Sequence, residues 1–135
     1  MIQSSFPASA RADFLAGVHQ QAHTYRLALY TSDANIGPAT VAYTARGEVR
    51  GPGYTAGGIR LAGRVVGSDK QGRAVLTFVQ PARIENCTIT ARGAIVYNDS
   101  AEGKPVLCVL DFGSDVRSAN GPFSVDFGDA LITLE

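Results

Sequence analysis

The sequence predicts an all-β fold, an antiparallel β-sandwich or jelly roll of about seven or eight strands with a short N-terminal helix or arm. The chain has 135 residues, a length that suits one hydrophobic core. Hydrophobic residues make up 45% and charged residues 18%, as in a packed domain. Short apolar runs alternate with turn residues, and no helical pattern separates them. We therefore expect a single domain over residues 1–135, with the helix or arm over 1–23 and the sandwich over 24–135.

The N-terminal segment carries the helical pattern. Side chains recur at helical spacing at Ala12, Leu15, Ala16, His19 and His23. Pro7 and Ser9 stand where such a helix would begin. The pattern predicts a helix from residue 9 to about residue 21.

Strand patterns follow the helix. The first is expected at residues 25–31, where Tyr25, Leu27 and Leu29 share one side of an alternating run. Further patterns cover residues 58–66, 73–79, 87–97, 104–112, 123–127 and 130–134, with turn residues between them. Residues 106–110 are apolar on both sides, which predicts a central strand or one covered by another chain. The last strand is also apolar on both sides, which suits a subunit contact or the middle of a sheet.

Residues 32–55 form a segment that is interrupted too often for a long element. Asn35, the pair Gly37-Pro38, Gly47 and the triplet 51–53 (Gly-Pro-Gly) interrupt it. We expect a long ordered loop that holds at most one short strand or turn. Such loops in compact domains usually serve function or an interface, so this loop is a leading candidate for a working surface.

The residues needed for nucleophilic or zinc chemistry are sparse. The chain has two histidines, His19 and His23, and lacks the G-x-S-x-G motif. Their spacing of four would place both rings on one helix face, but the glutamate of the H-E-x-x-H zinc motif is absent. We interpret them as a solvated or interfacial pair and predict no metal site.

Other chemistry-bearing groups have structural interpretations. Four aspartates crowd the C-terminal third, next to glycines or strand ends, where aspartate bonds turn amides: Asp111, Asp115, Asp126 and Asp129. The glycine-rich residues 51–58 match neither phosphate-loop motif. Cys87 and Cys108 fall on predicted strands, and we expect small core side chains there. The sequence therefore predicts a protein that is not an enzyme and has no cofactor.

Charge and hydropathy limit the partners. Acidic and basic residues balance at twelve each, so we expect no nucleic-acid partner. No apolar run approaches the length of about eighteen residues that spans a bilayer, and no signal-peptide pattern opens the chain, so a soluble protein without a membrane partner is expected. The basic residues are ten arginines and two lysines. Protein interfaces are enriched in arginine and depleted of lysine, so this excess of arginine favours assembly, although a GC-rich genome would produce the same bias.

A series of short motifs carries a resemblance to a known family. In order they read ALYT, GE, GYTAGG, ARGAIVYN and LDFG, beginning at residues 28, 47, 53, 91 and 110. The series resembles small structural proteins of tailed bacteriophages and covers most of the chain after the predicted helix. More loosely, the chain is similar to jelly-roll cement proteins that decorate phage capsid shells. The resemblance implies a virion-associated protein that acts by assembly.

The resemblance leads to a functional hypothesis. We predict a capsid cement or decoration protein that bridges major capsid subunits and contacts neighbouring copies of itself as a homo-oligomer. Its place would be the virion, on the capsid exterior or neck, after synthesis in the cytoplasm of the bacterial host. Candidate interface residues lie in the long loop: Tyr43, Arg46, Arg50 and Tyr54. The alternatives are a neck, collar or tail-fibre component, a carbohydrate-binding sandwich and, with the least support, a small hydrolase.

Overall fold

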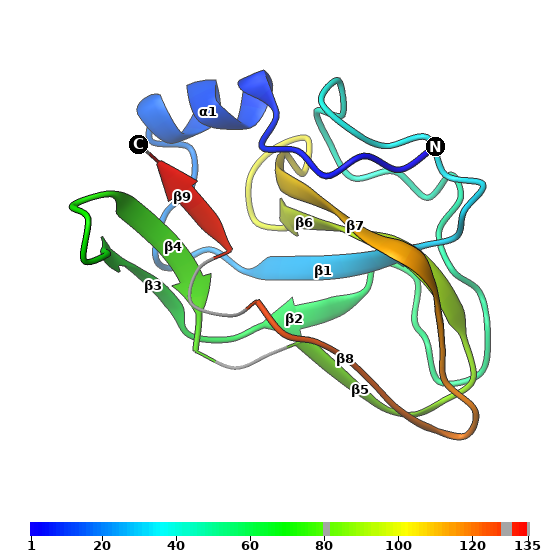
Figure 1. The fold of residues 1–135 in the computed structure, drawn as a ribbon. Helices are drawn as coiled ribbons and strands as arrows, with labels where there is room; N and C mark the ends of the chain where they lie inside the picture. Colours follow the sequence, from blue (N-terminus) through cyan, green and yellow to red (C-terminus); the bar gives the residue numbers. More distant parts are fainter. Residues whose placement is uncertain (80–81, 128–130, 135) are drawn as a thin grey trace.

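The protein is mostly β, with antiparallel strands and one short helix in the described part of the chain (Figure 1). The computed structural model describes residues 1–79, 82–127 and 131–134. The elements in chain order are α1 (Ala8–Leu15), β1 (Tyr25–Tyr30), β2 (Ile59–Leu61), β3 (Arg64–Ser68), β4 (Ala74–Phe78), β5 (Ala82–Cys87), β6 (Thr90–Asn98), β7 (Val106–Arg117), β8 (Gly121–Val125) and β9 (Ile132–Leu134). The predicted all-β sandwich class is confirmed, whereas the jelly-roll alternative stays a prediction.

The strands form three sheets. The largest has the order β2-β1-β6-β7, the second β3-β4-β9, and the third is the pair β5-β8. In the large sheet β1 pairs with β6 along its whole length, from Tyr25 opposite Asn98 to Tyr30 opposite Gly93. The β1–β6 pair is the centre of the large sheet, and the long loop begins at the end of β1.

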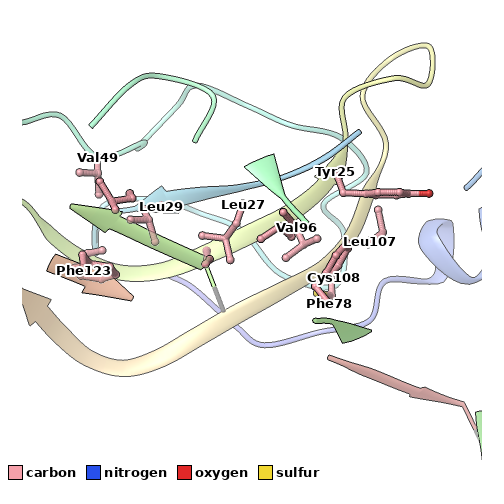
Figure 2. Close-up of a cluster of buried hydrophobic side chains, with 14 of the residues drawn as sticks. Tyr25, Leu27, Leu29, Val49, Phe78, Val96, Leu107, Cys108 and Phe123 are labelled. Atoms are coloured by element: carbon pink, nitrogen blue, oxygen red, sulfur yellow. The ribbon is translucent and has the colours of Figure 1, made fainter. Parts of the chain in front are cut away.

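Both faces of the large sheet are buried. Successive side chains of a strand point to opposite faces, so β1 contributes side chains to both. On one face Leu27 and Leu29 of β1 join a cluster that includes side chains of β4, β5 and β8, part of which Figure 2 shows. On the other face Ala28 and Tyr30 pack with Ile2, Ala34 and Ile36. The smaller sheets therefore cover the first face, and the N-terminal segment and the long loop cover the second.

The chain leaves the large sheet at Gly63. The sequence pattern predicted one strand over residues 58–66, and the structure divides it into β2 and β3. Gly63 has φ of 73°, and a Cβ there would lie 2.8 Å from Cβ of Val79. Because glycine alone tolerates this conformation and contact, the chain can turn here and pair β3 with β4 instead of continuing along β1.

Helix α1 is shorter than the sequence predicted. It ends in a Schellman motif, in which Gly17 N–H donates to the Phe14 carbonyl at 3.2 Å and Val18 N–H to the Asp13 carbonyl at 3.0 Å. Gly17 supplies the required left-handed conformation, with φ of 75°. The expectation that the helix runs to about residue 21 is therefore wrong, and His19 and His23 lie in the turns after it.

Strand β7 has two buried faces at its N-terminal half, as its apolar sequence predicted. It is not central, however, because it ends the order of the large sheet. The chain's own N-terminal segment covers its outer edge: Ser5 and Val109 exchange backbone hydrogen bonds of 3.0 and 2.9 Å. Its two faces are also buried within this chain, because Leu107 and Cys108 join the first cluster and Val106 and Val109 join the second, so no other chain is needed to cover the second face.

Several boundaries differ from the sequence pattern. Strand β5 was not predicted, β7 continues past the expected turn at Gly113, and β9 ends its sheet order instead of lying in the middle. Residue 130 of the last predicted strand lies outside the described residues. Cys87 and Cys108 are both buried and free, as expected for small core side chains.

Candidate functional site: the loop between β1 and β2

Residues 31–58 connect β1 to β2 as one long ordered loop, as the sequence predicted. No named strand interrupts it in the structure. Isolated bridges attach it to three parts of the molecule: Ile36 to Ile2, Ala42 to Pro105 and Glu48 to Tyr30. The loop is thus fixed along its length by backbone pairing, which limits its conformational freedom.

The segment around Glu48 lies along the end of β1. Thr31 N–H donates to the Gly47 carbonyl, and Val49 N–H donates to the Leu29 carbonyl, each at 2.9 Å. Further on, Gly58 has φ of 85°, and a Cβ there would lie 1.9 Å from the Leu27 carbonyl oxygen. The loop therefore contacts β1 at both positions, and the second contact admits only glycine.

Glu48 is the centre of the loop. Its side chain is 9% exposed. Oε1 accepts a hydrogen bond of 2.6 Å from the Tyr43 hydroxyl, and Oε2 accepts bonds of 2.6 Å from the Tyr54 hydroxyl and 2.8 Å from Gly57 N–H. The group accepts from three donors, so its burial is compensated by hydrogen bonds.

Further tyrosines extend this network. The Tyr30 hydroxyl donates to the Thr44 carbonyl at 2.6 Å, and the Tyr97 hydroxyl donates to the Gly57 carbonyl at 2.5 Å. The rings of Tyr43 and Tyr97 lie 4.8 Å apart. Each phenol thus ties a different point of the loop to the sheet or to Glu48.

The network also shifts the ionisation of its phenols. Burial, and then the hydrogen bond to Glu48, raise the pKa of Tyr43 and of Tyr54 well above the usual value. Burial and then the Glu48 charge raise the pKa of Tyr30, and burial followed by the Asp99 charge raises the pKa of Tyr97 to about 12. The tyrosines are therefore neutral hydrogen-bond donors, not nucleophiles.

The outer side of the loop is basic. Arg46 and Arg50 flank the paired segment 47–49, and both are exposed. Among the described residues, no ion pair joins either arginine to a carboxylate. Glu48, the acid between them in sequence, is buried and holds the tyrosines. The loop thus presents two guanidinium groups to solvent from a fixed backbone.

A groove lies beside the first half of the loop. It has a volume of about 390 Å³ and is lined in part by Gln3, Asn35, Pro38 and Val41. Val41 is 60% exposed. The groove gives the loop a concave contact surface next to the N-terminal segment.

The four interface candidates fall into two pairs. Arg46 and Arg50 face solvent, as a contact residue must, whereas the hydroxyls of Tyr43 and Tyr54 turn inward and meet at Glu48. Sequence reasoning missed Glu48 itself. The available signal was a single glutamate between the two tyrosines of a glycine-rich loop.

The two histidines meet at Asn98. The buried Asn98 Nδ2 lies 3.1 Å from His19 Nδ1 and 2.8 Å from His23 Nδ1. Its Oδ1 accepts backbone hydrogen bonds from Ser100 and Ala101, which fixes the orientation of the amide. With the amide in this orientation, both imidazoles face its N–H donor with Nδ1. Burial lowers the pKa of His19 to about 4, against an opposing effect of the Asp13 charge.

Metal and membrane chemistry find no support in the described residues. Within residues 1–79, 82–127 and 131–134, no group of three or more His, Cys, Asp or Glu side chains could hold a metal ion. Asp111 accepts from Gly113 N–H at 2.9 Å, the kind of local backbone bond that the sequence predicted, but it lies within β7 and not at a turn. Asp129 lies outside the described residues. No helix in the described part of the chain has the length and apolar character needed to cross a membrane.

Comparison of the chain with protein-family models, with curated proteins and with solved structures gives no match. The arrangement of the loop therefore provides the structural argument for function.

Proposed function

We propose that the protein is a virion structural protein, a cement or decoration protein that binds a tailed-phage capsid and bridges its major capsid subunits. The proposal combines the motif resemblance with one structural observation. A long loop, fixed from within by Glu48, presents Arg46 and Arg50 without intramolecular carboxylate partners in the described residues. Such a loop is suited to binding a surface that carries carboxylates.

Rigidity supports binding over catalysis. A loop that is ordered before binding loses little conformational entropy when a partner docks. On a shell, many copies with modest interfaces gain affinity because each copy contacts several subunits. Arginine suits this role because its planar guanidinium binds carboxylates through two parallel hydrogen bonds.

The carbohydrate-binding alternative needs exposed aromatic faces. Tyr43 and Tyr54 are partly buried, and both hydroxyls are engaged by Glu48. Little of either ring face is therefore accessible to a sugar. The neck, collar or tail-fibre alternative uses the same kind of surface and differs in copy number.

The experiment compares shells assembled with and without the protein. We expect the protein on the shell in hundreds of copies by electron cryomicroscopy, together with a higher temperature of thermal disruption. A copy number of tens at a vertex or tail would support the neck or tail alternative. No occupancy on the particle would refute both.

Charge reversal tests the loop directly. Arg46→Glu and Arg50→Glu should each weaken shell binding, and added salt should weaken binding of the unaltered protein. Arg117→Glu is the matched control, because Arg117 is exposed at the end of β7, outside the loop. An equal loss of binding in all three variants would contradict the assignment of the contact to the loop.

A further inference from the structure

Strand β3 (Arg64–Ser68) has a free edge. It ends the order β3-β4-β9 (Figure 1). Val79 N–H donates to the Gly63 carbonyl, and Asp69 N–H donates to the Arg73 carbonyl, so residues 63, 65, 67 and 69 direct their backbone groups toward β4. Because this direction alternates along a strand, Arg64, Val66 and Ser68 direct theirs to the outer edge.

That outer edge is only partly covered. Gln21 Nε2 donates to the Arg64 carbonyl at 2.8 Å, which agrees with the outward direction of Arg64. Within the part of the chain that the structure describes, the outward backbone groups of Val66 and Ser68 meet no partner. A β3 edge with these groups unpaired is a template for a further strand.

The side chains of β3 also favour a partner. Val65 is 44% exposed and Val66 is 58% exposed, on opposite faces, and residues 65–68 carry no charge. Natural sheets usually protect an edge with a charge, a proline or a covering segment. The β2 edge carries the exposed Arg60, and the N-terminal segment covers the β7 edge. Strand β3 lacks such protection over its central residues.

An apolar cavity opens beside this edge. It has a volume of about 90 Å³, and its lining includes Phe14, Val66, Leu76 and Ile132. Val66 lies at the free edge, so a strand added there would place its own side chain next to the cavity. An apolar side chain at that position would shield the cavity lining from water.

We infer that β3 pairs with β3 of a second copy of this chain, antiparallel and about a two-fold axis through Val66. In this register Val66 faces Val66 of the second copy, and Arg64 faces Ser68 of the second copy. The outward residues then form up to about six backbone hydrogen bonds once the Gln21 side chains leave the Arg64 carbonyls, and the two Val66 side chains lie side by side over the cavities. The two three-stranded sheets become one continuous sheet.

The charge pattern of β3 and its hairpin favours both a second β3 strand as the partner and the register centred on Val66. An uncharged, apolar strand is complementary to residues 65–68, and β3 itself meets this requirement. Pairing centred on Val66 sets each Arg64 opposite a neutral serine. A register shifted by two residues toward the hairpin would set Arg64 opposite Lys70, and like charges directly opposite are unfavourable. The self-complementary register is thus the one centred on Val66, and two-fold pairing of one patch with itself is the commonest form of homodimer.

Cysteine trapping tests the register. Cα atoms of a hydrogen-bonded antiparallel pair lie about 5.5 Å apart, within the range of a disulfide. We expect Val66→Cys to form a disulfide-linked dimer on mild oxidation, seen on a non-reducing gel. Val65→Cys should not, because residue 65 faces Gly67 of the second copy. The native Cys87 and Cys108 are buried and serve as an internal background. Equal trapping at both positions would overturn the register.

A charge at the centre tests the association itself. Sedimentation equilibrium of the unaltered protein should show a monomer–dimer equilibrium, and Val66→Lys should raise its dissociation constant at least tenfold. Val116→Lys is the matched control, since Val116 is 41% exposed on β7, away from β3 and the loop, and it should leave association unchanged. Far-ultraviolet circular dichroism checks that each variant folds; if Val66→Lys does not, the trapping result decides.

A protein that stays monomeric at every concentration, with no Val66→Cys disulfide, would overturn the inference. These experiments contain no shell. Failure here therefore leaves the shell-binding proposal intact, and failure to bind shells leaves the dimer intact.

Discussion

The Tyr54 hydroxyl bridges Glu48 and the large sheet: it donates to Glu48 Oε2 at 2.6 Å and accepts from Leu29 N–H at 3.0 Å. Leu29 belongs to β1, the central frame of the fold. One phenol thus links the carboxylate at the centre of the loop to the strand on which the loop is built. The shape of the loop and the stability of the domain are therefore coupled.

The first prediction concerns Glu48. Glu48→Ala would leave two hydroxyls and one backbone N–H of the loop without their acceptor, at a cost of about 3–5 kcal/mol in the free energy of unfolding. Urea denaturation measures the change. The control is Glu85→Ala, because Glu85 is exposed and, among the described residues, pairs only with the exposed Arg83; its effect should stay within about 0.5 kcal/mol. Equal effects of the two substitutions would show that the network adds no stability.

The second prediction compares two glycines with left-handed backbone. Gly58 has φ of 85°, and a Cβ there would lie 1.9 Å from the Leu27 carbonyl oxygen, whereas Gly72 has φ of 77° and a Cβ there would meet nothing within 4 Å. Gly72→Ala should cost about 1–2 kcal/mol, the left-handed penalty alone. Gly58→Ala should cost at least about 2 kcal/mol more, because β1 must move. Thermal and urea unfolding measure both, and similar losses would contradict the close approach.

The third prediction is a loss of stability in acid through His19. Its pKa is about 4 when folded and 6.5 in the unfolded chain, so between these values the unfolded state binds more protons. The free energy of unfolding should therefore fall as pH drops from about 6.5 to about 4, by about 3 kcal/mol in full. Asp13, Arg64 and His23 are the charged or titratable groups that act on this ring.

His19→Leu provides the comparison for the acid response. A side chain that cannot titrate should flatten the pH dependence in this window, whatever its effect on absolute stability. Urea denaturation at a series of pH values gives the slope. Identical slopes in the variant and the unaltered protein would remove His19 as the cause.

The fourth prediction concerns alkaline pH. Burial raises the pKa of Tyr25, and the pKa values of Tyr30, Tyr43, Tyr54 and Tyr97 are raised as well, so the folded protein should show no phenolate absorbance at 295 nm near pH 10. Because the unfolded phenols ionise at about 10, stability is lost as pH rises above that value. When urea unfolds the protein, the tyrosine phenols should titrate with their ordinary midpoint. A phenol that titrates near pH 10 in the folded protein would contradict the buried network.

The fold was largely predictable where one face of a strand is apolar. The patterns at residues 25–31 and 73–79 correctly predicted β1 and β4, because the alternation of apolar and polar residues indicates which face of a strand is buried. Strand β5 was missed because its Arg83 and Glu85 are polar and follow closely on the turn signal at residues 80–81 of the sequence. The helix was predicted too long because spacing alone does not show that Gly17 takes a left-handed conformation and ends it.

The site was predictable in outline. Glycine and proline indicated the loop, and its two tyrosines and two arginines were named from sequence. The role of Glu48 was not, because its burial depends on β1 and on the Tyr30 bridge, which are set by tertiary pairing. The meeting of His19 and His23 at Asn98 likewise joins residues 79 and 75 positions apart, beyond any local pattern.

The N-terminal cover of β7 bears on the order of folding. Asp111 N–H donates to Ser4 Oγ across a sequence separation of 107 residues, and Ser5 pairs with Val109 nearby. During synthesis, residues 1–5 leave the ribosome long before β7 exists, so they must remain undocked until most of the chain has followed. In the interval before docking, the apolar edge of β7 is open to other nascent chains. Once β7 has been made, a high local concentration of this protein should therefore favour aggregation at that edge until residues 1–5 dock.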